Sequence, residues 1–302
     1  MPNTNGTGHT ENRTGRIERR RCPLYSDFRC EFLEPRKPVV ISSALDRWQA
    51  LSRWTPAFFK QTYGAVPLHA NNQPYTLGGF LPKRKDGSPL TLGEFIDLVL
   101  ASSNEKPAPY LRNVHIEKFL PELDADLRPV PDYFQPNWLE GPAGKPLDTR
   151  LHGGRFELYI GGTGGKFPVL HYDTWHIHTF LSQIYGVKRY TLFAPDQSRF
   201  LYPRGNQSQV DLENVDIEKF PLFASATPIS CDLQAGEILF VPAGWWHTTR
   251  ILTPSITVSA SRVNASNWRD FSHDLKAKAP KHVRPLLAAY LTSLRLYHAI
   301  SL

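Results

Sequence analysis

Between residues 155 and 261 the chain is a series of short runs rich in Val, Ile, Thr, Tyr and Phe, each bounded by Gly, Pro or Asp. The first residue types favour strands, and Gly, Pro and Asp favour the turns between them. Several such runs within about a hundred residues indicate packed antiparallel sheets. The runs read FELYIGG, FLSQIYG, KRYTLFAP, ILFVPAG and SITVSAS. We therefore predict a mainly β fold, a sandwich or jelly roll.

Proline content agrees with this fold class. Proline accounts for 26 of the 302 residues, well above the usual share of about 5%. Frequent prolines cut a chain into short pieces and disfavour long helical bundles. We expect four parts: a disordered basic tail (1–21), flanking strands and helices (22–150), the β core (151–265) and C-terminal helices (266–302).

Helices are expected on both sides of the core. In SRWTPAFFKQTYG (52–64), Pro56 follows Thr55 and Gly64 closes the segment, which is a helix-start and helix-stop pattern. Apolar residues in 90–103 recur at helical spacing, and 38–45 reads as a strand. Residues 282–298 carry an apolar stripe, which predicts that this helix covers the core or a second subunit. We expect a homodimer through it. The stripe comprises Val283, Leu286, Leu287, Tyr290, Leu291, Leu294 and Tyr297.

The net charge of +7 lies at the two ends of the chain. Residues 1–21 carry five arginines against two glutamates, and residues 266–302 carry six lysines and arginines against two aspartates, so the centre is neutral. A nucleic-acid enzyme usually concentrates basic charge around its working face. A nucleic-acid partner is therefore not favoured, although a basic arm can contact phosphates.

The sequence predicts a cytoplasmic protein without a membrane partner. No apolar run reaches the roughly 18–20 residues that span a bilayer. The first 21 residues lack the apolar segment of a signal peptide. The three cysteines are odd in number and include no CxxC pair, which argues against a disulfide framework or a cysteine zinc site.

Three residues form a candidate metal site: His171, Asp173 and His247. His171 and Asp173 lie two apart in VLHYDT, so both point to the same face of a strand. Two histidines and one carboxylate, with the other coordination positions open, are the ligands of non-haem Fe(II) oxygenases. An isolated HxD often occurs by chance, and turn or surface residues are the alternative interpretation.

The surrounding pattern favours the metal site. Gly165 begins G-x5-H-x-D, and Gly236 begins G-x5-P-x-G-x2-H, which ends at His247. In each pattern a turn precedes a strand that ends in a ligand. The neighbouring His176 and His178 form a rival HxH pair, but no Glu follows at the expected spacing. We expect these two to lie on the opposite strand face or in a connecting loop, where they could still line a substrate pocket.

Together these segments resemble the JmjC/cupin-like Fe(II)- and 2-oxoglutarate-dependent oxygenases. The resemblance rests on residues 170–203 and 232–249, and 31–48 and 210–223 also resemble segments of that family. It is closest to the small hydroxylase-type members, such as the asparaginyl hydroxylase of hypoxia-inducible factor and the tRNA wybutosine hydroxylase. It implies a double-stranded β-helix, with Fe(II) as cofactor and 2-oxoglutarate and O2 as cosubstrates.

The resemblance also implies roles for single residues. His171, Asp173 and His247 would hold the iron and be the catalytic residues. Lys188, in GVKRY, matches the lysine that pairs with the distal carboxylate of 2-oxoglutarate, and a solvent-facing strand lysine is the alternative. Pro168 stands where relatives often have a threonine that helps to hold 2-oxoglutarate, so the contact must come from other residues. The other candidates for cosubstrate binding are Tyr110, Thr179 and Ser259.

The implied reaction is hydroxylation of an unactivated C–H bond, with release of succinate and carbon dioxide. We expect the substrate to be a protein or peptide side chain. The alternatives are a small molecule, in a closed pocket lined by His176, His178 and Tyr172, or a modified tRNA base. Histone-lysine demethylation is a less favoured variant, because the sequence shows no reader domain or zinc-binding segment. A third possibility is a metal-binding cupin without oxygenase activity.

Overall fold

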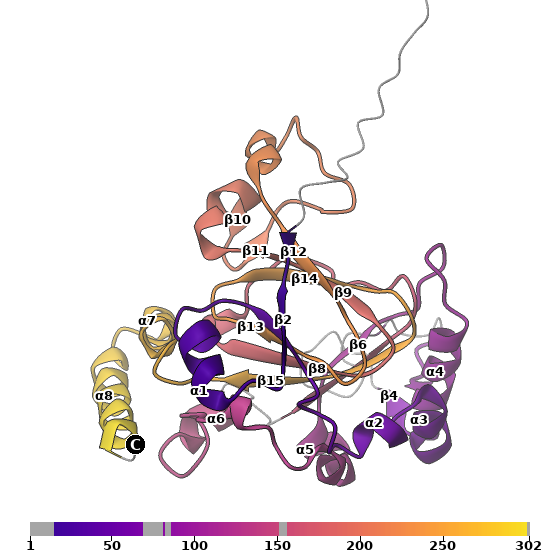
Figure 1. The fold of residues 1–302 in the computed structure, drawn as a ribbon, viewed down its shortest axis with the longest axis horizontal. Helices are drawn as coiled ribbons and strands as arrows, with labels where there is room; N and C mark the ends of the chain where they lie inside the picture. Colours follow the sequence, from indigo (N-terminus) through magenta and orange to yellow (C-terminus); the bar gives the residue numbers. More distant parts are fainter. Residues whose placement is uncertain (1–14, 69–80, 82–85, 151–155, 301–302) are drawn as a thin grey trace, which may run out of the picture.

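The protein is described by a computed structural model for residues 15–68, 81, 86–150 and 156–300 (Figure 1). Two sheets face each other and confirm the predicted jelly roll. The smaller sheet consists, in order, of β1 (Gly15–Arg16), β12 (Ile229–Leu233), β9 (Lys188–Phe193) and β14 (Trp246–Ile251). The larger sheet consists, in order, of β2 (Glu18–Arg21), β3 (Val39–Ser42), β13 (Ile238–Val241), β8 (His178–Tyr185), β15 (Ser255–Arg262), β7 (Glu157–Gly161) and β6 (Leu111–His115).

Strand alternation divides the larger sheet into a polar and an apolar face. On β8, Thr179 and Leu181 line an internal cavity, whereas Phe180 and Ile184 belong to the main apolar core on the other face. Because successive side chains of a strand point to opposite faces, one strand serves both the site and the core. β15 alternates in the same way: Thr257, Ser259 and Ser261 line the cavity, and Ile256, Val258 and Ala260 enter the core.

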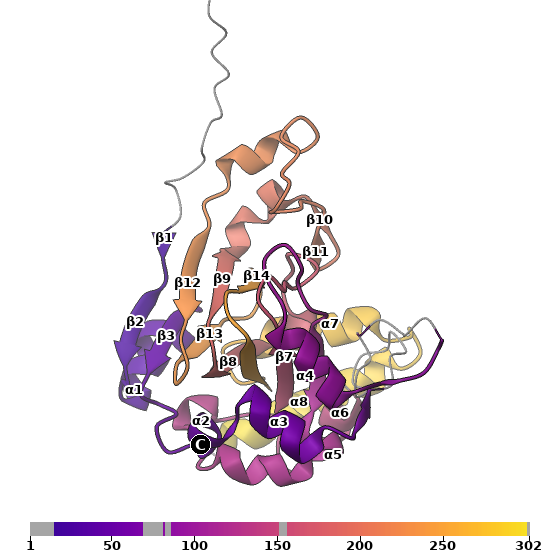
Figure 2. The same ribbon diagram turned by 90° about the vertical axis from the view of Figure 1, so that its right-hand side faces the viewer.

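The main core lies between the larger sheet and the helices that follow β2 and β3 (Figures 1 and 2). Phe28, Phe59 and Phe95 from the helices on this side, and Trp54 directly after one of them, are fully buried there. Aromatic side chains bury large apolar areas, so this layer supplies much of the hydrophobic stabilisation. The helices on this side are α1 (Tyr25–Phe28), α2 (Ala50–Arg53), α3 (Pro56–Tyr63), α4 (Leu92–Leu100) and α5 (Ile116–Phe119).

The helix signals in the sequence are confirmed at α3 and α4. The Thr55 side chain accepts a hydrogen bond from the Phe58 backbone N–H, and Pro56 occupies the first helical position. At α4, Thr91 and Glu94 form a reciprocal capping box. Two short antiparallel strand pairs complete the flanking structure, β4 (Pro67–Leu68) with β5 (Leu90–Thr91) and β10 (Pro203–Arg204) with β11 (Gln207–Ser208).

The prediction of a disordered tail up to residue 21 is wrong for residues 15–21. They form β1 and β2, which pair in parallel with β12 and β3. Ile17, between the two strands, is buried, and Arg19 forms an ion pair with Glu237. Residues 1–14 of the expected tail lie outside the described residues. Backbone pairing and ion pairs order this arginine-rich segment, although Ile17 is its only apolar side chain.

The C-terminal helices form a second apolar cluster. α7 (Trp268–Lys278) and α8 (Arg284–Ile300) pack against the segment that precedes and includes α6 (Lys145–Arg150). From the predicted stripe, Leu287, Tyr290, Leu291 and Leu294 face this cluster. Leu286 and Tyr297 are exposed instead, because the helix turns these two positions outward. The homodimer through residues 282–298 stays a prediction, which light scattering would test.

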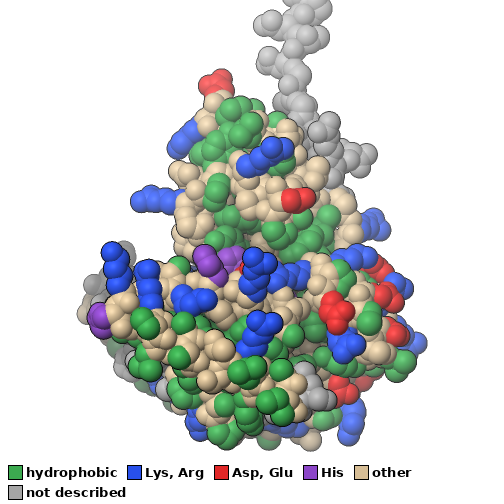
Figure 3. All heavy atoms as spheres, turned by 90° about the vertical axis from the view of Figure 1, so that its left-hand side faces the viewer, with side chains coloured by type: hydrophobic (Ala, Val, Ile, Leu, Met, Phe, Trp, Pro, Cys, Tyr) green, Lys and Arg blue, Asp and Glu red, His purple; other side chains and the backbone are tan. Residues whose placement is uncertain are grey.

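The basic charge of residues 266–302 is located on the same helices. Figure 3 views the side on which α7 and α8 lie in Figure 1, and Lys and Arg side chains project from it. Lys276, Lys278, Lys281 and Arg284 are exposed around the connection between the helices. None of the helices among the described residues is long and apolar enough to cross a membrane.

Candidate metal centre

His171 and His247 lie opposite each other on neighbouring antiparallel segments of the smaller sheet. The His171 N–H donates to the His247 carbonyl over 3.1 Å, and the His247 N–H donates to the His171 carbonyl over 2.6 Å. Residues that exchange both backbone hydrogen bonds project their side chains to the same face. The two ring centroids are accordingly 4.4 Å apart.

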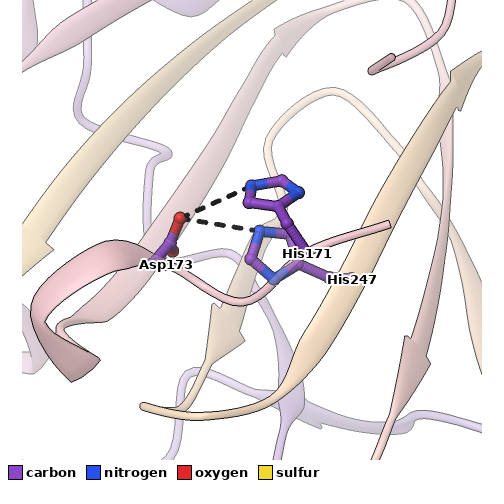
Figure 4. A group of neighbouring side chains, drawn as sticks. All are labelled: His171, Asp173 and His247. Carbon is purple, nitrogen blue, oxygen red and sulfur yellow. Dashed lines mark ion pairs between the residues drawn. The ribbon is translucent and has the colours of Figure 1, made fainter. Parts of the chain in front are cut away.

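Asp173 completes the group (Figure 4). Its Oδ1 atom lies 3.7 Å from His171 Nε2 and 3.8 Å from His247 Nε2. The three potential ligand atoms all lie within 4.8 Å of one another. One metal ion placed between them could therefore bind all three, as the spacing in the sequence predicts.

Hydrogen bonds orient both imidazoles toward this point. His171 Nδ1 lies 3.2 Å from the Val169 carbonyl, and His247 Nδ1 lies 3.1 Å from the Trp245 carbonyl. A carbonyl only accepts, so each Nδ1 carries a proton, and Nε2 is then the nitrogen that can bind a metal when the imidazole is neutral. Burial, together with the nearby His247, lowers the pKa of His171 to about 4. At neutral pH His171 is thus the neutral form that metals bind.

Thr179 holds the remaining carboxylate oxygen. Its hydroxyl donates a hydrogen bond to Asp173 Oδ2, which leaves Oδ1 facing the two histidines. Thr179 also lines the cavity beside the triad. The resemblance assigns Thr179 to cosubstrate binding. The sequence alone does not reveal its contact with Asp173, a metal-ligand candidate. The contact of Thr179 with 2-oxoglutarate stays a prediction.

Lys188 and Tyr110 meet inside the same cavity. Lys188 Nζ lies 2.7 Å from the Tyr110 hydroxyl and 4.8 Å from the centre of its ring. Lys188 is fully buried, so it is not the solvent-facing strand lysine considered as the alternative. Burial lowers the pKa of the Lys188 ammonium to about 7 and raises that of the Tyr110 hydroxyl. An anion that entered beside Lys188 would compensate this loss of solvation.

The cavity has a volume of about 740 Å³ and extends from Lys188 past the triad to the surface. Ser259 on β15 lines it, as does Pro168. The structure therefore brings all seven predicted site residues to one cavity. It also adds residues from β6 and β7 that sequence reasoning missed.

These additional residues form a polar wall. Glu157 Oε2 accepts hydrogen bonds from Asn113 Nδ2 and from the Tyr159 hydroxyl, each over 3.0 Å. Asn113 has a positive φ of 54° where the register of β6 and β7 shifts, and such irregularities redirect side chains near functional sites. The alternation of Glu157 and Tyr159 in FELYIGG was the signal that could have identified them.

Arg112 supports the triad from the side. Its guanidinium carbon lies 4.7 Å from the centre of the Phe167 ring, which stacks on His171 at 4.4 Å with an interplanar angle of 17°. The stack limits rotation of the His171 ring. Since Arg112 also lines the cavity, it is a second, partly buried cation near the site.

His176 and His178 are placed away from the triad. His178 on β8 is fully buried, accepts a hydrogen bond from the Ala243 N–H and lies 2.7 Å from the Ser266 hydroxyl. Burial lowers its pKa to about 3. His176 Nδ1 lies 2.8 Å from Asp274 Oδ2. Neither residue is among the described residues that line the cavity, and Tyr172 is also outside this lining.

The sequence matches the model of a family described as a cupin-like domain, over residues 25–264. It is 31% identical to lysine-specific demethylase 8 of Danio rerio over 260 residues, which are 82% of this chain and 58% of that protein. It is 30% identical to tRNA wybutosine-synthesizing protein 5 of Gallus gallus over 234 residues, 70% of this chain and 66% of that protein. Arginine-specific demethylase JMJ20 of Arabidopsis thaliana is 27% identical over 278 residues, 82% of this chain and 58% of that protein. The chain spans little more than half the length of the first of these relatives.

Proposed function

This chain belongs to the cupin-like family that includes the JmjC oxygenases, and from that membership we propose that it is an Fe(II)- and 2-oxoglutarate-dependent dioxygenase that hydroxylates an unactivated C–H bond. One observation carries the proposal. The His171–Asp173–His247 group and the buried Lys188 share one cavity. A metal site alone would fit any cupin, whereas a buried cation beside it fits a dianionic cosubstrate.

The donor set fits Fe(II). Two imidazole nitrogens and one carboxylate oxygen lie within 4.8 Å of one another, and the residues that carry them line the cavity. Two histidines and one carboxylate are the donor set by which non-haem iron oxygenases hold Fe(II). When bound, iron and 2-oxoglutarate would activate O2 and deliver one oxygen atom to the substrate.

The chain's own residues would bind and orient the cosubstrate. Lys188 would pair with its distal carboxylate, and the Tyr110 hydroxyl would donate to the same group. Ser259 and Thr179 are proposed to contact the part of the molecule nearer the metal. Burial of Lys188 excludes water from this end of the cavity, which strengthens the ion pair.

We propose a protein or peptide side chain as the substrate. Glu157, Asn113 and Tyr159 offer hydrogen-bonding groups to a polar side chain near the metal. Hydroxylation of an N-methyl carbon would proceed by the same chemistry and release formaldehyde, and two of the relatives are named demethylases. A small molecule or a modified tRNA base is the second candidate, since one relative is a tRNA wybutosine-synthesizing protein.

The proposal is tested without knowing the substrate. Protein purified without oxygen is given Fe(II) and then 2-oxoglutarate, and the visible metal-to-ligand charge-transfer band is recorded. We expect a band in the wild type, none in Asp173→Ala and a weak one in Lys188→Ala. Lys106→Ala, which removes an exposed lysine, is the control. Folded, iron-loaded protein without a band would refute the oxygenase and favour a metal-binding cupin.

A further inference from the structure

The turn Thr174–His176, directly after Asp173, has a backbone that ordinary residues adopt only at a cost. φ is 69° at Trp175 and 46° at His176, so both residues lie in the left-handed region. This region is unfavourable for L-residues other than glycine, and for bulky ones above all. Contacts elsewhere in the molecule must therefore hold the turn.

Helix α7 supplies these contacts. Asn267, at the start of α7, is fully buried, and its Nδ2 donates to the His176 carbonyl over 2.9 Å. About two turns further along, Asp274 Oδ2 lies 2.8 Å from His176 Nδ1. The backbone and the side chain of His176 are thus both bound to the same helix.

The end of α7 also fixes Trp175. Lys278 Nζ lies 4.1 Å from the centre of the Trp175 ring, which is a cation–π contact. The ring of Trp175 packs against the apolar cluster of α7 and α8, and it lines the cavity that contains the triad. This one turn therefore connects Asp173, a metal-ligand candidate at its start, with Trp175, which lines the cavity.

We propose that Asp274 and Asn267 are positioning residues of the metal centre, which act by holding the strained turn and thereby the Asp173 carboxylate. The inference rests on the proposed function, because it assumes that the triad binds a metal. Without the contacts of Asn267 and Asp274 with His176, the turn would relax from its left-handed conformation and displace Asp173. Metal binding would then have to restore the strained turn, which would lower the affinity. α7 begins after residue 264, where the similarity to the cupin-like family ends. The metal centre would thus depend on a helix outside that region.

The first test compares two side-chain contacts made by the same helix. Asp274→Ala breaks the pair with His176, and Asp270→Ala breaks the pair that α7 makes with Arg36 at 2.6 Å. Mn(II) affinity is measured by titration under electron paramagnetic resonance, without cosubstrate or turnover. We expect about tenfold weaker binding in Asp274→Ala, the lower end for residues that orient metal ligands. We expect no change in Asp270→Ala.

The second test separates the backbone from the side chain. His176→Ala and His176→Gly both remove the imidazole, but glycine adopts the left-handed region without a steric cost. We expect His176→Ala to lose Mn(II) affinity about tenfold. His176→Gly should retain affinity within about threefold of the wild type, although glycine usually destabilises a chain more than alanine.

Each outcome has a distinct meaning. Wild-type protein that fails to bind Mn(II) would refute the proposed function itself. If the wild type binds and Asp274→Ala binds equally well, the positioning role is wrong. Equal losses in Asp274→Ala and Asp270→Ala, or equal affinities of the alanine and glycine variants at His176, would also overturn it, since the effect would then be general loosening of α7.

Discussion

Replacing Lys188 by methionine should stabilise the protein in the absence of cosubstrate and prevent it from binding 2-oxoglutarate. Lys188 is fully buried, and its ammonium contacts the hydroxyl and ring of Tyr110. No carboxylate of the described residues forms an ion pair with it, and burial alone lowers its pKa. In the protein without cosubstrate, the buried charge of Lys188 therefore lowers the free energy of unfolding. The proposed binding of 2-oxoglutarate requires this same charge.

The size of this cost follows from its pKa. Burial lowers the pKa of Lys188 from 10.5 to about 7, which at 1.36 kcal/mol per pH unit disfavours the charged form by about 5 kcal/mol. Methionine avoids this penalty, but it leaves the buried Tyr110 hydroxyl without its partner, at a cost of about 1–3 kcal/mol. We expect the free energy of unfolding to rise by about 2–4 kcal/mol at pH 6.5.

The gain in the free energy of unfolding from Lys188→Met should decrease as the pH rises. Between pH 7 and 10.5 the unfolded chain binds a proton at Lys188 that the folded chain does not, so the stability of the wild type rises with pH in this window. The penalty is complete below pH 7 and is lost as the pH rises toward 10.5. The advantage of Lys188→Met should therefore be about 3 kcal/mol smaller at pH 9.5 than at pH 6.5.

Urea unfolding of the metal-free proteins at both pH values measures these differences. Lys106→Met is the matched control, because it removes an exposed lysine and should change stability by less than about 0.5 kcal/mol. A Lys188→Met protein that is less stable than the wild type at pH 6.5 would refute the reasoning. So would a difference that does not change with pH.

The affinity of the wild type for 2-oxoglutarate should fall nearly tenfold between pH 7.5 and 8.5, because binding then requires Lys188 to take up a proton. Calorimetry at constant ionic strength would measure this affinity. An affinity that does not change with pH would contradict the role of Lys188. Thr91→Ala removes the capping box of α4 and should cost about 1 kcal/mol in urea unfolding without changing Mn(II) affinity. Gly186→Ala should cost about 2 kcal/mol or more, because φ is 70° and the new methyl group would collide with the Pro254 carbonyl; an unchanged unfolding midpoint would show that the turn can shift.

The metal-site candidates could be predicted because their signal is local. His171 and Asp173 lie on one face of a short extended segment, and the Pro and Gly residues before His247 mark a turn. Each half of the site lies within about a dozen consecutive residues, and alternate side chains of an extended segment point to the same face. The meeting of Lys188 with Tyr110 needed the resemblance to known oxygenases, since 78 positions separate the two residues.

The features that were missed depend on distant partners. Residues 15–21 look like a charged tail, because parallel pairing at a sheet edge uses backbone groups and leaves no apolar alternation in the sequence. The contact of Thr179 with Asp173 arises only once the turn between them has folded back. Asn267 meets the carbonyl of His176 from 91 positions away, and no local pattern announces it.

The reciprocal backbone bonds between His171 and His247 have a consequence for how such proteins diversify. The register of the two segments fixes the distance between the two histidines, whatever the length of the chain that joins them. That joining chain includes the lobe with β10 and β11, drawn at the top of Figure 1. Evolution or protein engineering could lengthen, shorten or exchange the tip of this lobe and alter what reaches the cavity, while the spacing of the two histidines stays the same.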